Sequence, residues 1–388
     1  MRKLLIYILI LNIGLLQLAC NTEEGLEPVT PKNYFKILEG RGTDNPIAIR
    51  SLSDGNLLIV SNTTSFEQGE QIRKIRVLKI DLNGNVLNER YLPENNENWS
   101  AKDVLKLTND EIVIASTSIN SIAEDSSLVF YKINSNLDSL SATTHHNSAT
   151  YNLYGVAEDQ NELLFIAQEF KDQTSYPIIG RIDLSSSNII DIKSAEKYDV
   201  PPATKAYRNA VGEYIWAYNR TRSYLAKVQP NLLQVNDQEI HIGNNLSSSV
   251  KAEKLLMIDM NPIVFGELTQ NGNNQLFYYS QESGSSFVFG ESGDVFLNNV
   301  QKTESGYLVT GFQSLQIDGS ENRQTNFYFS RRNANGGEIF SKAFGTNENE
   351  ELMDALMIND GIYTIGKTIF GGENTLILIK TDAFGRLQ

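Results

Sequence analysis

Asn56-Leu-Leu-Ile-Val-Ser61 is the first of seven short runs of β-branched and aromatic residues that recur along this chain of 388 residues. The second residues of the seven runs are separated by steps of 44 to 55 residues. The other six are Glu111-Ile-Val-Ile-Ala-Ser116, Glu162-Leu-Leu-Phe-Ile-Ala167, Glu213-Tyr-Ile-Trp-Ala-Tyr218, Pro262-Ile-Val-Phe-Gly-Glu267, Gly306-Tyr-Leu-Val-Thr-Gly311 and Gly361-Ile-Tyr-Thr-Ile-Gly366. Such a period is typical of a repeat in which each copy forms one four-stranded blade.

A second marker follows the first in every copy. It is another strand that ends in a polar turn, as in Lys79-Ile-Asp81, Arg181-Ile-Asp183 and Lys380-Thr-Asp382. Asp or Asn at the start of a tight turn, with Gly supplying a positive φ, is the chemistry of a hairpin between neighbouring strands. We therefore interpret Asp81, Asp183 and Asp382 as turn residues and not as ligands.

The last repeat stops at Gln388, after its hairpin turn, and so lacks an outer strand. The segment from Tyr34 to Asp44 resembles the outer-strand segment from Glu338 to Asn347 in its apolar run, its glycine and its ending. An N-terminal strand that completes the C-terminal blade protects the edges of the sheet. The sequence therefore predicts an all-β fold, a seven-bladed β-propeller of four-stranded blades closed in this way.

Two other architectures were considered. A ring of six or eight blades remains open, because the fourth and fifth copies are the most degenerate. A β-sandwich is disfavoured, since it does not predict two markers in the same order seven times.

The first twenty residues combine a basic start at Arg2 and Lys3, an apolar run from Leu4 to Leu16, and Cys20, the only cysteine of the chain. This order resembles a bacterial lipoprotein signal peptide, in which the cysteine is acylated and becomes the mature N-terminus. Gln17 departs from the pattern, which has an aliphatic residue there. An ordinary secretory signal and a buried helix are the alternatives. The apolar run is too short for a membrane span, which needs about 20 residues.

The resemblance implies three segments: a signal peptide over 1–19, the lipid attachment site Cys20 with a flexible linker over 20–32, and the propeller over 33–388. The linker contains Glu23 and Glu24, and acidic residues shortly after an acylated cysteine resemble surface-export signals of Gram-negative lipoproteins. The expected location is the cell envelope, lipid-anchored in the outer membrane and exposed at the surface.

The formal net charge of −14 argues against nucleic acid as a partner and against electrostatic binding to anionic membranes. We expect contact with the membrane through the lipid anchor only, and a monomer. A single acylated cysteine leaves none for a disulfide, for thiol catalysis or for a metal site.

Gly306-Tyr-Leu-Val-Thr-Gly311, followed by a second strand and Asn333-Ala-Asn-Gly-Gly337, resembles the propeller repeats of secreted and surface lipoproteins from Gram-negative bacteria. The resemblance covers nearly all of the mature chain and implies the fold, but it says little about function. The Gly-His and Trp-Asp pairs of WD40 repeats are missing, as is the Ser-x-Asp-x-Gly-x-Thr-Trp box of sialidase-like propellers.

The search for catalytic residues returns few candidates. His145 and His146 fall on the expected outer strand of the second blade, where adjacent side chains point to opposite faces and cannot share a metal. We expect them to be exposed to solvent. His241 likewise lies outside the funnel, no Gly-x-Ser-x-Gly element occurs, and no metal or cofactor is predicted.

Carboxylates at the mouth of the central channel are the remaining possibility. The innermost strands carry Asp103, Asn299 and Asp354 at their first positions, with Arg50 nearby in the first repeat. Two carboxylates across a funnel can act as acid and base on a glycan. A polar channel mouth is also expected of any hydrated propeller.

Two hypotheses about function follow, together with a weaker third. The favoured one is a lipid-anchored binding or scaffold propeller whose rim loops bind an unknown protein, peptide or glycan. The contact surface would be the long loops Thr63 to Arg73, Ser118 to Ser126 and Gln313 to Gln324, while Trp99 and Trp216 pack between blades. The alternative is a surface glycan hydrolase or lyase using the funnel carboxylates, and a role in outer-membrane assembly is a third hypothesis.

Overall fold

A computed structural model describes residues 33–387 apart from 68–69, 95–96, 121–124, 172, 196–199, 232–234, 243–248, 291–292, 317–322, 347 and 360. The predicted signal peptide, Cys20 and the linker up to residue 32 lie outside these described residues. Within the described part, every regular element is a strand. A search of the same residues for a helix able to cross a membrane finds none.

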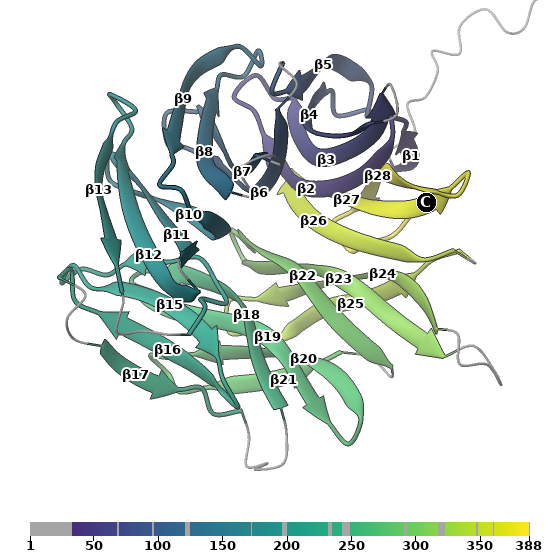
Figure 1. Cartoon of the computed structure of the whole chain (residues 1–388). Coiled ribbons are helices and arrows are strands. Elements are labelled where there is room, and N and C mark those ends of the chain that lie inside the picture. The colour runs from purple at the N-terminus through teal and green to yellow at the C-terminus, as the bar shows by residue number, and fades with distance from the viewer. Residues whose placement is uncertain are drawn as a thin grey trace, which may run out of the picture. The chain divides into compact units, whose positions relative to one another are not determined.

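The strands form seven four-stranded antiparallel sheets, which are the blades of a β-propeller (Figure 1). Blades 1 to 6 are β2–β5, β6–β9, β10–β13, β14–β17, β18–β21 and β22–β25, and blade 7 is β26–β28 with β1. In the described structure, the first strands of neighbouring blades contact one another at six of the seven junctions, the exception being β14 and β18, so they line the axis of the ring. Seven blades and four strands per blade are as predicted from the repeats.

The first, innermost strands are β2 (Thr43–Ser51), β6 (Asn98–Lys106), β10 (Thr150–Asp159), β14 (Tyr207–Arg208), β18 (Ser249–Ile258), β22 (Asp294–Thr303) and β26 (Glu350–Ile358). The second strands are β3 (Leu57–Glu67), β7 (Ile112–Asn120), β11 (Glu162–Lys171), β15 (Tyr214–Asn219), β19 (Asn261–Gln270), β23 (Gly306–Gln316) and β27 (Gly361–Phe370). The third strands are β4 (Glu70–Ile80), β8 (Asp125–Ile133), β12 (Thr174–Asp183), β16 (Ser223–Val228), β20 (Asn273–Ser280), β24 (Arg323–Asn333) and β28 (Glu373–Asp382). The outer strands are β5 (Val86–Leu92), β9 (Ser139–His145), β13 (Ile189–Ser194), β17 (Val235–Glu239), β21 (Ser286–Phe289), β25 (Glu338–Phe344) and β1 (Tyr34–Leu38).

The N-terminal strand closes the ring. β1 pairs antiparallel with β28, from Tyr34 opposite Lys380 to Leu38 opposite Leu376, and so supplies the outer strand of blade 7. In Figure 1 these two strands from opposite ends of the propeller lie side by side. This is the closure predicted from the missing outer strand of the last repeat.

The core lies between the blades. In the described residues, buried apolar side chains form seven clusters, one at each junction of neighbouring blades. On β3, Leu57 and Ile59 pack toward blade 7 whereas Leu58 and Val60 pack toward blade 2. Because successive strand residues point to opposite faces and both faces are covered, the buried part of each second strand is almost entirely apolar, with Thr310 of β23 and Thr364 of β27 among the exceptions. That burial explains the run that marks each repeat.

The polar turns also follow the prediction. Oδ1 of Asp81 accepts hydrogen bonds from the N–H groups of Asn83 and Asn85, at 2.9 and 2.8 Å. The side chains of Asp183 and Asp382 accept backbone N–H groups in the same way. These carboxylates shape hairpin turns, as expected for Asx turns.

Candidate functional site

A bulge on the first strand sets the geometry at the axis. In six blades of the described structure, the pairing between first and second strands shifts once, and the residue after the shift lies eight or nine positions before the second residue of the apolar marker. In blade 4, where β14 has only two residues, the same count gives Lys205. We call the seven residues the axial ring: Ala48, Asp103, Gly155, Lys205, Lys254, Asn299 and Asp354.

The predicted funnel residues are therefore at the axis, but not at the first positions of their strands. Asp103, Asn299 and Asp354 occupy the middle of β6, β22 and β26, while Arg50 lies two residues after Ala48 on β2. The bulge, and not the start of the strand, turns these side chains toward the axis.

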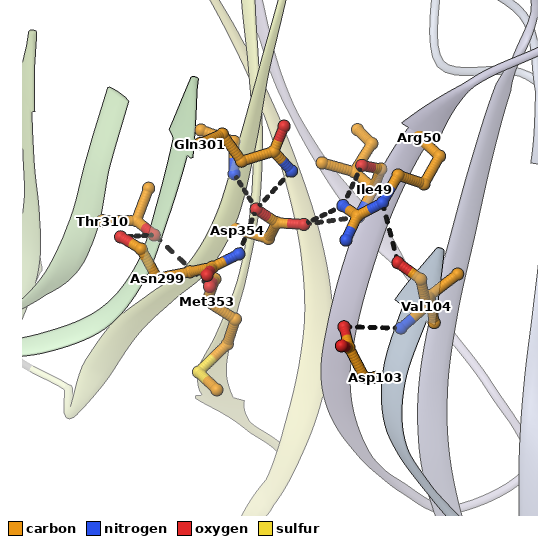
Figure 2. Close-up of polar contacts among 10 residues, drawn as sticks. Ile49, Arg50, Asp103, Val104, Asn299, Gln301, Thr310, Met353 and Asp354 are labelled. Carbon is orange, nitrogen blue, oxygen red and sulfur yellow. Dashed lines mark hydrogen bonds and ion pairs between the residues drawn. The ribbon is translucent and has the colours of Figure 1, made fainter. Parts of the chain in front are cut away.

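Asp354 is fully buried and accepts five hydrogen bonds. Its Oδ1 accepts Nδ2 of Asn299 and Nε2 of Gln301, both at 2.8 Å, and its own neighbour's N–H at 2.8 Å. Its Oδ2 accepts the N–H of Ile49 at 3.0 Å and Nη1 of Arg50 at 2.6 Å. Figure 2 shows this carboxylate enclosed by donors from blades 6, 7 and 1.

Arg50 joins blades 7, 1 and 2. Besides Asp354, its guanidinium donates through Nη1 to the carbonyl of Ile49 at 2.7 Å and through Nε to the carbonyl of Val104 at 3.0 Å (Figure 2). The Arg50 side chain is 18% exposed. This ion pair is thus held within the wall of the ring, with Nε and Nη1 of Arg50 bonded to protein acceptors.

Asp103 repeats part of this arrangement at the next junction but one. Its Oδ1 accepts the N–H of Val104 at 2.9 Å and its Oδ2 accepts the N–H of Val156, on blade 3, at 3.0 Å. Burial by itself would raise the pKa of Asp103, but Lys205, the N–H of Val156, Arg50 and Lys254 lower it overall. Asp103 therefore remains a carboxylate that fastens blade 2 to blade 3.

Two lysines of the axial ring were missed by the sequence reasoning. Lys205 and Lys254 are half-buried, and in the described structure neither Nζ lies within 4 Å of a carboxylate oxygen. Burial lowers the pKa of Lys254, and Asp103 and Glu253 offset only part of this effect. Counting back eight or nine residues from each apolar marker would have found both, because the position is the same in all seven repeats.

The histidines differ from one another. His146 and His241 are exposed, as predicted. His145, on the outer strand β9, is instead half-buried: its Nε2 lies 3.2 Å from the hydroxyl of Tyr151, and burial lowers its pKa. The expectation of exposure was wrong for this residue because its side chain packs against the Tyr151 ring of the next blade. No group of three His, Cys, Asp or Glu residues in the described part of the chain could hold a metal ion.

The three predicted rim loops are mostly extended hairpins. Thr64 pairs with Arg73 at the base of the β3–β4 extension, and Ser118 with Ser127 and Ser314 with Thr325 in the equivalent extensions of blades 2 and 6. The expectation of loops was wrong because these polar segments continue the ladder beyond the buried part of the blade. Two cavities of about 440 and 400 Å³ flank the β3–β4 extension, and Arg41 and Ser65 line both.

The two tryptophans pack between blades, as expected. Trp99 is 8% and Trp216 0% exposed, in the clusters between blades 1 and 2 and between blades 3 and 4. They are core residues and not ligand platforms.

Comparison with known proteins identifies the fold. No protein-family profile matches the sequence, and neither does any curated protein with which it was compared. An acylaminoacyl peptidase of Pyrococcus horikoshii is similar with a TM-score of 0.52 and 10% identity over 88% of this chain and 52% of the peptidase. The chain thus spans about half the length of that enzyme.

Two further structures are similar over most of their own length. The β-propeller domain of the trilobed protease from Pyrococcus furiosus, described as having an open velcro topology, gives a TM-score of 0.51 at 11% identity over 89% of this chain and 97% of that domain. A protein of unknown function from Bacteroides caccae gives 0.46 at 12% identity over 70% and 90%. Identities this low show the fold alone.

Proposed function

We propose that this chain is a lipid-anchored protein of the cell envelope whose propeller binds a protein, peptide or glycan without catalysing a reaction on it. The observation that carries the proposal is that the oxygens of the funnel carboxylates are already hydrogen-bonded to donors from the protein itself. Asp354 accepts five hydrogen bonds while fully buried, and Asp103 accepts backbone N–H groups on both oxygens.

A glycosidase needs one carboxyl group that protonates the leaving oxygen and another that attacks or activates water. Asp354 cannot reach a substrate without giving up donors from blades 6, 7 and 1. The arrangement supports a structural role for these carboxylates and argues against the hydrolase or lyase alternative.

The rim of blade 1 is the surface that we favour for binding. The cavities on either side of the β3–β4 extension are lined by a mixture of charged and polar side chains, among them Arg41, Lys74 and Glu94. The guanidinium of Arg41 also lies 4.6 Å from the centre of the Tyr91 ring. A polar groove beside a paired hairpin suits recognition of a polar partner.

A crosslinking experiment tests the surface. A photoreactive residue is placed at Gln71, on the rim extension, or at Asn83, in the exposed turn beyond the other end of β4. In a Gram-negative host we expect a discrete adduct from position 71 and none from position 83. Equal adducts from both positions, or an adduct from position 83 alone, would contradict the rim assignment.

Two further measurements test the rest of the proposal. Cys20→Ser is expected to move the chain from the membrane fraction to the soluble fraction, and an unchanged distribution would refute the lipid anchor. Release of reducing ends from envelope glycans, abolished by Asp354→Asn or Asp103→Asn in folded protein, would replace the binding role by catalysis.

A further inference from the structure

The axial ring has an uneven distribution of charge. Its two carboxylates, Asp354 and Asp103, belong to blades 7 and 2 and flank Arg50 of blade 1. Its two lysines belong to the adjacent blades 4 and 5. One side of the ring is thus a closed network of ion pairs and hydrogen bonds, and the other side carries two lysines at equivalent positions of adjacent blades.

Asp103 neutralises these lysines only in part, because its single carboxylate attracts both of them without forming an ion pair. The oxygens of Asp354 are committed to five donors, and those of Asp103 to two backbone N–H groups. The ammonium groups of Lys205 and Lys254 have no carboxylate oxygen within 4 Å in the described structure. One carboxylate, Asp103, thus faces two half-buried lysines that form no ion pair with a described residue, and an anion would balance the remaining positive charge.

Gly155 fixes the position of Lys205. A Cβ atom at Gly155 would lie 2.8 Å from Cβ of Lys205 and 2.9 Å from Oδ2 of Asp103, so any larger residue would displace the lysine. The ammonium of Lys205 lies 5.7 Å from the centre of the Tyr207 ring. The lysine is therefore held against the wall of the channel by packing, and its position is set before any ligand arrives.

Lys254 occupies the equivalent position on the next blade. It follows the bulge of β18 as Asp103 follows that of β6 and Asp354 that of β26. Its pKa is lowered chiefly by burial, with Lys205 among the groups that add to the lowering. That effect fits two like charges that lie close to each other.

We propose that Lys205 and Lys254 together bind a small oxyanion, a carboxylate or a phosphate group, in the central channel. This inference goes beyond the proposed function, because it involves the axis and not the rim and does not depend on a partner there. The formal net charge of −14 repels an anion from most of the surface, whereas the two lysines attract it at the axis.

The test uses the purified full chain in detergent, with inorganic phosphate and succinate as probes at constant ionic strength and pH 7. Isothermal titration calorimetry is expected to give saturable binding of at least one probe, weakened at least tenfold by Lys254→Met and by Lys205→Met. Lys254→Arg should bind within a few fold of the unmodified chain. The tighter of the two probes identifies the oxyanion.

Lys251→Met is the matched control, because Lys251 lies on the same strand but is 59% exposed and pairs with Glu253. It should bind like the unmodified chain. Lys254→Met removes a half-buried cation, so its thermal midpoint without anion should be at least that of the unmodified chain, which separates lost binding from misfolding. Absence of saturable binding, or equal binding by Lys254→Met and Lys251→Met, would overturn the proposal.

Discussion

Two regions of the propeller hold their strands in place by different means: the junction between blades 7 and 1, and blade 4. At the junction, β2 pairs with β3 over nearly all of its nine residues, and β1 reaches the neighbourhood of a buried ion pair between Arg76 and Asp44. The guanidinium of Arg76 also donates to the carbonyls of Leu38 and Glu39, at 2.9 and 2.6 Å. The end of the closing strand is thus held by a charge inside blade 1.

Blade 4 has almost no inner strand. β14 consists of Tyr207 and Arg208 only, and the segment before it meets β15 through an isolated bridge between Pro202 and Tyr218. One side chain and one backbone hydrogen bond replace part of the missing ladder. Oγ1 of Thr204 accepts the N–H of Ala217 at 2.9 Å, and the N–H of Ala203 donates to the carbonyl of Ala217 at 2.8 Å.

A blade can therefore lose most of its inner strand if a side chain and isolated backbone hydrogen bonds satisfy the groups that the strand would have paired. It also explains why the fourth repeat reads as degenerate while the ring stays regular. The apolar second strand and the residue at the axis are retained, and the polar substitutes leave no periodic signal.

Arg76→Met should have the largest effect at the strong junction. It leaves the carboxylate of Asp44, which is 0% exposed, without its counter-ion, and we expect the free energy of unfolding in urea to fall by about 3–5 kcal/mol. Adding Asp44→Asn should recover part of the loss. Lys106→Met is the control: it breaks an exposed pair with Asp110 and is expected to cost about 0–1 kcal/mol. An equal loss for Arg76→Met and Lys106→Met would show that the buried pair stabilises the fold no more than the exposed one.

Asn62→Ala and Asn219→Ala remove the same pair of inter-blade hydrogen bonds in the two regions. Asn62 holds the N–H and carbonyl of Ala101 as Asn219 holds those of Ala252, so each substitution should cost about 2–3 kcal/mol through buried unpaired backbone groups. Hydrogen exchange should distinguish them. Asn219→Ala is expected to speed exchange locally in β15 and β16, because blade 4 lacks a full ladder. Equal, uniform changes would remove the distinction between the regions.

Thr204→Val tests the substitute for the ladder directly. The shape is kept while the acceptor for the N–H of Ala217 is lost, and we expect about 1–2 kcal/mol of destabilisation in urea. Thr174→Val, at an exposed hydroxyl that donates to the carbonyl of Lys171, should change stability by less than about 0.5 kcal/mol. If the two variants behave alike, the Thr204 hydroxyl does not hold blade 4 together.

Asp103→Asn should have the smallest effect of the four, and that effect should shrink as the pH falls into the acid range. Because the pKa of Asp103 is lower in the folded chain than the unfolded value of about 3.9, its contribution to stability is present above that value and is lost as the pH falls through the folded pKa. Urea midpoints measured from pH 6 to pH 3 should fall less steeply for the variant. Parallel curves would mean that the hydrogen bond to Val156 does not couple the carboxylate to folding.

The sequence was sufficient for the architecture because the signals are local. A strand buried on both faces is apolar throughout, as at Leu57 to Val60, and an Asx turn needs its own Asp or Asn, as at Asp81. The hydrogen bonds of Asp354 could not be inferred in this way, since its donors come from three blades and from positions as distant as Ile49 and Asn299. The rim hairpins were missed because an exposed polar ladder has no apolar alternation.

The closing strand imposes an order of events on folding. Tyr34 and Lys380 pair although nearly the whole propeller separates them in the chain. At a synthesis rate of about 5 to 20 residues per second, β1 waits roughly 20 to 70 s for β28 to emerge. During that time its edge is unpaired and Phe35 and Ile37, which stay 45% and 37% exposed even in the closed ring, have no sheet beside them. Closure of the ring therefore joins β1 to β28 as the last step of folding. Until β28 is available, β1 remains an unpaired, partly apolar strand that can pair with other chains.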